Sequence, residues 1–273
     1  MMKLDLGQAW NDATAMLSAN RQVLLVLGGI FFFLPSLLSG IVVPQVPPPA
    51  GYEEAQMSAY LEANNAHVMQ WWWMYLLVIA ALILGYLAIL TLLRDPRRLS
   101  VGSSIGQALA ALLPAIGAYV LFSLVLGAIV TVLLLLTAAT GGIGGIITVP
   151  LMIFAVIYLS VRASMSAPVI AVEGQRNPVA VLKRSWALTK GNAGRLLAFY
   201  LLLGIAYIVL AVVIGGVLSL LAALFPPSAG ALLLGIVGGL IGTVFTVIML
   251  CVIAAVHRRL SGRSDADLKE MFE

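Results

Sequence analysis

The sequence predicts an all-α integral membrane protein, a bundle of six membrane-spanning helices arranged as three hairpins, each preceded by a cytoplasmic interfacial amphipathic helix. Three observations predict this fold. Apolar residues make up 62% of the 273 residues and charged residues only 10%, whereas a soluble domain carries about 25% charged residues. The mean hydropathy is +1.09. The apolar residues also form long continuous runs, and every lysine and arginine lies outside them.

These apolar runs predict helices rather than barrel strands. In lipid every backbone N–H and C=O needs an internal partner, so a span is either a helix or a strand of a closed barrel. Barrel strands alternate in polarity over about 10 residues, but the runs here are uninterrupted. A helix needs about 20 residues to cross the hydrocarbon. The predicted spans are residues 22–43, 71–93, 108–139, 143–161, 196–225 and 229–256.

The charges predict the orientation. All 15 lysines and arginines fall in four of the seven segments outside the spans. Residues 44–70 are acidic instead, and the other two connections are Gly-Gly and Pro-Pro turns. Because basic residues are retained on the cytoplasmic side, both termini are predicted to be cytoplasmic, in a bacterial inner membrane. About twenty mixed residues precede the first run, so no cleaved signal peptide is predicted. The basic residues are Lys3, Arg21, Arg94, Arg97, Arg98, Arg162, Arg176, Lys183, Arg184, Lys190, Arg195, Arg258, Arg259, Arg263 and Lys269.

Three segments before the odd-numbered spans have apolar residues at helical spacing, and we expect each to lie in the membrane interface. A further short helix over residues 52–68 is expected on the periplasmic surface. The pattern suggests one membrane domain, 1–273, built from units 1–93, 98–165 and 174–257, although amphipathic connectors also occur in multispan proteins without repeats. Asn177-Pro178 predicts a helix start and Gly191-Asn192 a helix stop. The three apolar stripes are Leu6, Trp10, Ala13 and Leu17; Ile105, Leu109 and Leu112; and Val179, Leu182 and Trp186.

Residues that could carry chemistry are sparse. No charge lies at a span centre, and no nucleophile-and-base motif, phosphate-binding loop or Cys-x-x-Cys is present. His67 and His257 are predicted on opposite sides of the membrane, and Cys251 is the single cysteine. The sequence therefore predicts no enzyme, metal site, cofactor or disulfide. Basic charge beside spans favours anionic lipid headgroups as partners over nucleic acid.

Glycines in the last span predict close helix packing. Gly235 and Gly239 are four residues apart, as are Gly238 and Gly242. Such spacing lets two helix backbones approach closely. Packing within the chain is the first interpretation. A homo-oligomer interface and a narrow cavity lined by backbone are the alternatives.

The most distinctive stretch, residues 158–191, resembles a known family. It contains Tyr-Leu-Ser-Val-Arg at 158–162, Ala-Pro-Val-Ile-Ala-Val-Glu-Gly at 167–174 and Leu-Lys-Arg-Ser-Trp-Ala-Leu-Thr-Lys-Gly at 182–191. These motifs, with the six-span layout, resemble the membrane domain fused to some glycerophosphoryl diester phosphodiesterases and the related YciC-like family of bacterial inner-membrane proteins. The residues that match the motif are Arg162, Glu173, Gly174, Arg184, Ser185, Trp186, Thr189 and Gly191.

The resemblance implies a multispan domain without a settled activity. The phosphodiesterase chemistry of such proteins belongs to a separate soluble barrel with His, Glu and a divalent metal, which this sequence does not show. The motif residues are expected to fix the connector against the spans. Together with Lys183 and Lys190 they form a hypothetical lipid-headgroup site, in which Glu173 pairs with Arg162, Arg176 or Arg184.

The expected function is a non-enzymatic membrane protein that binds or organises lipids or envelope partners. A small-solute or lipid transporter or channel is the alternative, favoured by proline-kinked and glycine-rich spans. A membrane-embedded lipid-modifying enzyme is the third, and it would require polar groups clustered at one depth.

Overall fold

The computed structural model describes residues 4–44, 46–49, 51, 53–94 and 100–262, and every regular element in these ranges is helical. Six of the described helical segments are long and apolar enough to span a membrane, which confirms the predicted fold class. Lys3, Arg97, Arg98, Arg263 and Lys269 lie outside the described residues. The helices are α1 (Leu6–Ala19), α2 (Arg21–Gly28), the π-helical η1 (Gly29–Phe33), α3 (Leu34–Val42), α4 (Glu54–Arg94), α5 (Val101–Ala139), α6 (Gly145–Ala163), α7 (Ser166–Ala171), α8 (Pro178–Thr189), α9 (Ala193–Ala222) and α10 (Pro227–Leu260).

The second span is part of a much longer helix than predicted. α4 has 41 residues, a length of about 60 Å at about 1.5 Å per residue. The predicted separate helix over 52–68 is wrong, because most of that segment forms the first turns of α4. No glycine or proline occurs between Glu54 and Gly85. Nothing therefore breaks the helix before the predicted span, which begins with three tryptophans at 71–73.

Two of the three predicted amphipathic segments are separate helices, α1 and α8. The third is not separate, since residues 101–112 are the first turns of the 39-residue α5. The difference follows from the junctions. Asn20 separates α1 from the first span and Gly191-Asn192 separates α8 from α9. The middle junction contains Pro114, which does not end the helix, and α5 continues through it.

The first span contains a local change of helix type. α2 passes into the π-helical η1, and α3 begins one residue before Pro35. Proline has no N–H to donate to the carbonyl four residues earlier, and its ring crowds that carbonyl. A π-helical turn directly before the proline accommodates both effects within a continuous span.

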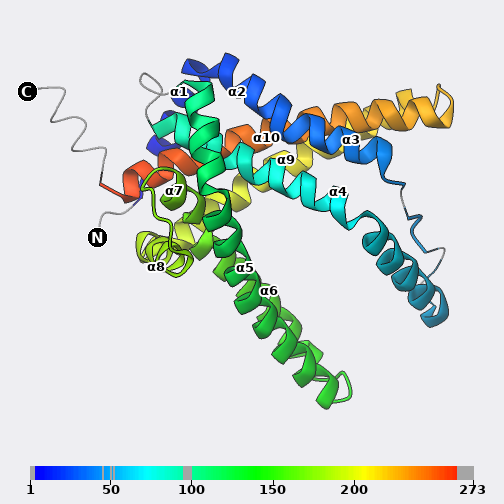
Figure 1. The fold of residues 1–273 in the computed structure, drawn as a ribbon. Helices are drawn as coiled ribbons and strands as arrows, with labels where there is room; N and C mark the ends of the chain where they lie inside the picture. Colours follow the sequence, from blue (N-terminus) through cyan, green and yellow to red (C-terminus); the bar gives the residue numbers. More distant parts are fainter. Residues whose placement is uncertain (1–3, 45, 50, 52, 95–99, 263–273) are drawn as a thin grey trace, which may run out of the picture.

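The tightly packed part of the molecule lies at one end. This basic end carries the termini of spans at Arg21, Arg94, Arg162, Arg195 and Arg258. There α1 packs on α10, α7 packs on α4 and α5, and α8 packs on α5. From it the α5–α6 hairpin and the α9–α10 hairpin extend in different directions (Figure 1). The most apolar stretch of α9 has 0% of its residues buried, so lipid rather than protein is its solvent.

A close approach between two spans involves a glycine outside the predicted pattern. A Cβ atom on Gly85 of α4 would lie 2.5 Å from the Phe31 Cβ and 2.7 Å from a ring atom of Phe32. The Phe32 ring in turn packs edge-on against Tyr86, with centroids 5.6 Å apart. The absence of a side chain at Gly85 therefore allows the first span to lie directly on the α4 backbone.

Candidate functional site

The connector between α6 and α9 holds most of the predicted site residues, and local sequence shapes it. The Asn177 side chain accepts hydrogen bonds from the N–H groups of Val179 and Ala180, at 3.0 and 3.2 Å, and Pro178 opens α8. This confirms the predicted helix start. Gly174 and Gly191 have φ angles of +72° and +79°, a left-handed backbone that favours glycine. Gly174 reverses the chain after α7, and Gly191 confirms the predicted stop after α8.

Glu173 joins the connector to the last span. Its two carboxylate oxygens accept from Nε and Nη2 of Arg184 at 2.9 and 3.2 Å. One of them also lies 3.1 Å from Nε2 of His257, a side chain with 2% exposure. Of the three predicted partners, the structure thus selects Arg184. It also adds His257 as a second partner, which the sequence analysis did not connect with Glu173.

The charge balance at Glu173 favours its ionised form. Burial raises the pKa of this carboxyl, but the hydrogen bonds and charges of Arg184 and His257 together outweigh burial and hold the pKa below its ordinary value of 4.5. Glu173 is therefore the anionic centre of a small bridge that ties α8 and α10 to the turn after α7.

Arg162 fastens the end of α6 to the end of α8. Its side chain is only 7% exposed. Nη1 donates to the carbonyl of Trp186 and to the hydroxyl of Thr189, each at 3.2 Å. In return, the Ser185 hydroxyl donates to the carbonyl of Arg162 at 2.7 Å. Four of the motif residues that the sequence singled out therefore form one contact between two helices: Arg162, Ser185, Trp186 and Thr189.

The Arg162 guanidinium has no described carboxylate partner and is stabilised in other ways. Its Cζ atom lies 4.4 Å from the ring centroid of Trp186 and 5.6 Å from that of Tyr158, so both rings offer cation–π attraction. The Trp186 carbonyl belongs to the last turn of α8, where the helix dipole favours a cation. Tyr158 was missed as a partner, although its spacing of four residues before Arg162 places both on one face of α6.

α8 has two distinct faces, and two of the three residues of the predicted apolar stripe lie on the exposed one. The buried residues are Val181, Ser185, Leu188 and Thr189, whereas Val179 and Trp186 are 49% and 42% exposed. Leu182 alone of the predicted stripe is partly covered. The reason is that Ser185 and Thr189 are inside, bonded to Arg162, and this turns the helix so that Val179 and Trp186 face outward.

The exposed face of α8 combines aromatic, aliphatic and basic side chains. Val179, Lys183, Trp186 and Lys190 follow one another at steps of four, three and four residues, so they share one face of the helix. All four are exposed. Arg176 and Arg195 are exposed nearby, and Nη1 of Arg195 also donates to the backbone carbonyl of Leu4 at 3.0 Å.

The glycines of α10 do not act as one packing surface within this chain. A Cβ on Gly239 would contact the ring of Phe33 at 3.3 Å, and one on Gly242 would meet the Tyr207 hydroxyl at 3.8 Å. Positions 235 and 238 face open space. The predicted intramolecular packing therefore holds for Gly239 and Gly242 but not for Gly235 and Gly238.

Among the described residues, no three His, Cys, Asp or Glu side chains gather closely enough to hold a metal ion. No family model, curated protein or solved structure matches this chain. The family resemblance carried by residues 158–191 therefore stays a prediction.

Proposed function

We propose that this multi-pass membrane protein is non-enzymatic and binds lipids with anionic headgroups through the exposed face of α8. The observation that carries the proposal is the single stripe of Val179, Lys183, Trp186 and Lys190. An interfacial helix inserts apolar and aromatic side chains at the headgroup level and directs lysines to lipid phosphates. Trp186 suits this depth because its ring is apolar while its N–H can be hydrated.

The rest of the connector supports this role by holding α8 rigidly. Arg162 fastens its last turn, and Glu173 fastens Arg184 in its middle. Arg162 lies over one side of the Trp186 ring, but Trp186 stays 42% exposed. Lys183 and Lys190 are exposed as well and remain available to lipid.

In the proposed orientation the basic end faces the cytoplasm of a bacterial inner membrane. Support comes from the charge bias of the whole sequence. It also comes from the described span ends that carry an arginine, because these lie together at the basic end of the molecule. A reporter enzyme fused after residue 273 tests it. Activity of a cytoplasmic reporter is expected, and export of the fusion to the periplasm would reject the orientation.

The lipid proposal is tested with the double variant Lys183→Glu, Lys190→Glu. Each basic residue near an anionic surface contributes about 1 kcal/mol, so the variant should lose tenfold or more of its preference for phosphatidylglycerol over phosphatidylcholine. Native mass spectrometry of the purified full chain with both lipids measures that preference.

The matched control is Arg21→Glu with Arg94→Glu, which makes the same charge change at the same end using exposed residues of other helices. It should retain most of the preference. Equal lipid preference in the α8 variant and the parent, or equal losses in the two double variants, would reject α8 as the binding face.

A further inference from the structure

A pocket of about 470 Å³ lies within the membrane-spanning part of the fold, between α4, α5, α6, α7 and the start of α8. This volume is within the range of about 300–1,000 Å³ that is typical of small-molecule sites. Leu87, Ala118 and Ile170 form its buried inner wall. Ile79, Tyr119 and Ser160 line it as well and are exposed, so the pocket opens on the outer surface of the helices, where lipid is the solvent.

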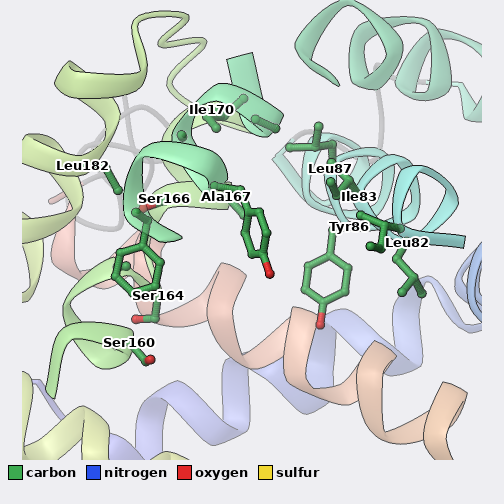
Figure 2. A pocket seen from close by; sticks show the side chains of 16 residues that line it. Leu82, Ile83, Tyr86, Leu87, Ser160, Ser164, Ser166, Ala167, Ile170 and Leu182 are labelled. Atoms are coloured by element: carbon green, nitrogen blue, oxygen red, sulfur yellow. The ribbon is translucent and has the colours of Figure 1, made fainter. Parts of the chain in front are cut away.

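The chemistry of the wall is apolar with hydroxyl groups and without charge. None of the 16 lining residues is Lys, Arg, Asp, Glu or His. Figure 2 shows Ser160, Ser164 and Ser166 along one side of the pocket, and Tyr86 opposite them with its aliphatic neighbours on α4. An ionised phosphate or carboxylate would lose its hydration here without gaining a cation, which is costly. The part of a ligand that enters is therefore uncharged.

Several of these hydroxyls lack a partner in the protein. The side chains of Ser160 and Tyr86 make no hydrogen bond within the described residues, and Ser160 is exposed at the pocket. The Ser166 hydroxyl also lacks such a partner, but protein atoms cover it fully, so a ligand in the pocket does not reach it. Ser164 differs, since it donates to the Val161 carbonyl at 2.7 Å. Polar groups away from water are normally paired, so free hydroxyls beside an apolar pocket indicate a ligand that carries hydrogen-bond acceptors.

The polar and apolar parts of the pocket follow one another in the same order as those of a lipid in the adjacent leaflet. Ser164 and Ser166 lie at the junction of α6 and α7, at the basic end. Ile79 of α4 and Phe122 of α5 lie further along their helices, towards the bilayer interior. At about 30 Å³ for a water-sized group, the volume holds roughly 15 such groups, which corresponds to one acyl chain rather than two.

We propose that this pocket binds one acyl chain of a membrane glycerolipid, with the chain along α4 and α5 and its ester carbonyl at the exposed Ser160 hydroxyl of α6. The proposal deepens the lipid-binding function proposed above, because it names the apolar part of the ligand. It requires no headgroup charge and fails independently of the α8 face.

The test uses the full chain in a nonionic detergent, titrated with a phosphatidylcholine that carries a photoreactive diazirine in one acyl chain. Crosslinked residues are then located by peptide mass spectrometry. Labelling is expected to saturate near one lipid per protein and to concentrate in residues 79–87 and 115–122. Labelling that rises without saturation and spreads along α9 would show only nonspecific lipid contact and would overturn the proposal.

Two variants sharpen the test. Ser160→Phe places a ring in the pocket mouth and should reduce labelling of α4 and α5 to background. The matched control Leu202→Phe, on the exposed surface of α9, should leave it unchanged. Equal labelling in both variants would overturn the proposal.

Ser160→Ala serves if the bulkier variant does not fold. Because the Ser160 hydroxyl is exposed and has no described protein partner, this change should leave the unfolding temperature without lipid unaltered. It should weaken lipid binding by roughly 2- to 10-fold, the equivalent of one hydrogen bond. Unchanged binding would overturn the role of the Ser160 hydroxyl. The α8 variant with both lysines replaced should keep full labelling, which separates failure of this proposal from failure of the headgroup site.

Discussion

Alanine at Gly174 and alanine at Gly194 should change stability in opposite directions. Gly174 has a φ of +72°, and a Cβ there would meet nothing within 4 Å. Gly194 lies in the first turn of α9 with helical backbone, and its Cβ would also meet nothing within 4 Å. Neither substitution gains or loses packing, so backbone conformation alone decides each result.

The magnitudes follow from the two conformations. A left-handed backbone costs a residue with a side chain about 1–2 kcal/mol, and the stiffer unfolded chain returns about 0.4–1 kcal/mol. Gly174→Ala should therefore lower the free energy of unfolding by about 0.5–1 kcal/mol. In a helix, alanine is preferred over glycine by about 0.5–1 kcal/mol, so Gly194→Ala should raise that free energy by this amount.

The assay is unfolding of the purified protein in mixed micelles, titrated with a denaturing detergent and followed by far-ultraviolet circular dichroism. The two variants should differ by about 1–2 kcal/mol, with the parent between them. A Gly174→Ala protein as stable as Gly194→Ala would refute the left-handed turn after Glu173, and with it the route by which the chain returns from α7 to α8.

Three further predictions use the same assay. Because the pKa of Glu173 is lowered on folding, its ion pair stabilises the protein at pH values above the ordinary pKa of glutamate, and this contribution disappears as pH falls through the lowered pKa. The parent should therefore exceed Glu173→Gln by about 1 kcal/mol near neutral pH and match it in acid; a constant difference across pH would contradict the ion pair. Arg162→Lys should cost about 2 kcal/mol, because an ammonium cannot both stack on Trp186 and reach its carbonyl, and a fully stable lysine variant would argue against this contact. Gly85→Ala should cost about 1–3 kcal/mol through overpacking, whereas Gly238→Ala in α10 should, like Gly194→Ala, gain about 0.5–1 kcal/mol; the reverse order would mean that the first span and α4 are wrongly placed.

The parts of the site that could be predicted were those set by neighbouring residues. Asn177 caps the helix that Pro178 begins, and Gly191 ends it, because capping and left-handed turns depend on a few adjacent positions. The partner of Glu173 could be narrowed only to three arginines. His257, which is 84 residues away in sequence, could not be inferred, since no local pattern relates the two.

The rotation of α8 about its own axis could not be predicted from the sequence either. The stripe of Val179, Leu182 and Trp186 was expected to lie in the membrane interface, but the side of α8 that faces the protein was not predicted. That side is partly polar, since Ser185 and Thr189 bond to Arg162, and Val179 and Trp186 face outward. At a membrane surface lipid accepts an apolar residue as readily as the core does, so hydrophobicity does not mark the inward face.

What the sequence by itself determined is the solvent, the number of spans and the gathering of basic residues at the same ends of the spans. Hydropathy and charge bias are sums over consecutive residues, and they require no knowledge of contacts. The tertiary structure alone decided which helices touch and where, as at Gly85 against Phe32 and in the pocket beside Ser166. The spans are apolar on nearly every side, so their rotation and crossing points depend on the fit of particular side chains, and that fit is a property of the assembled bundle.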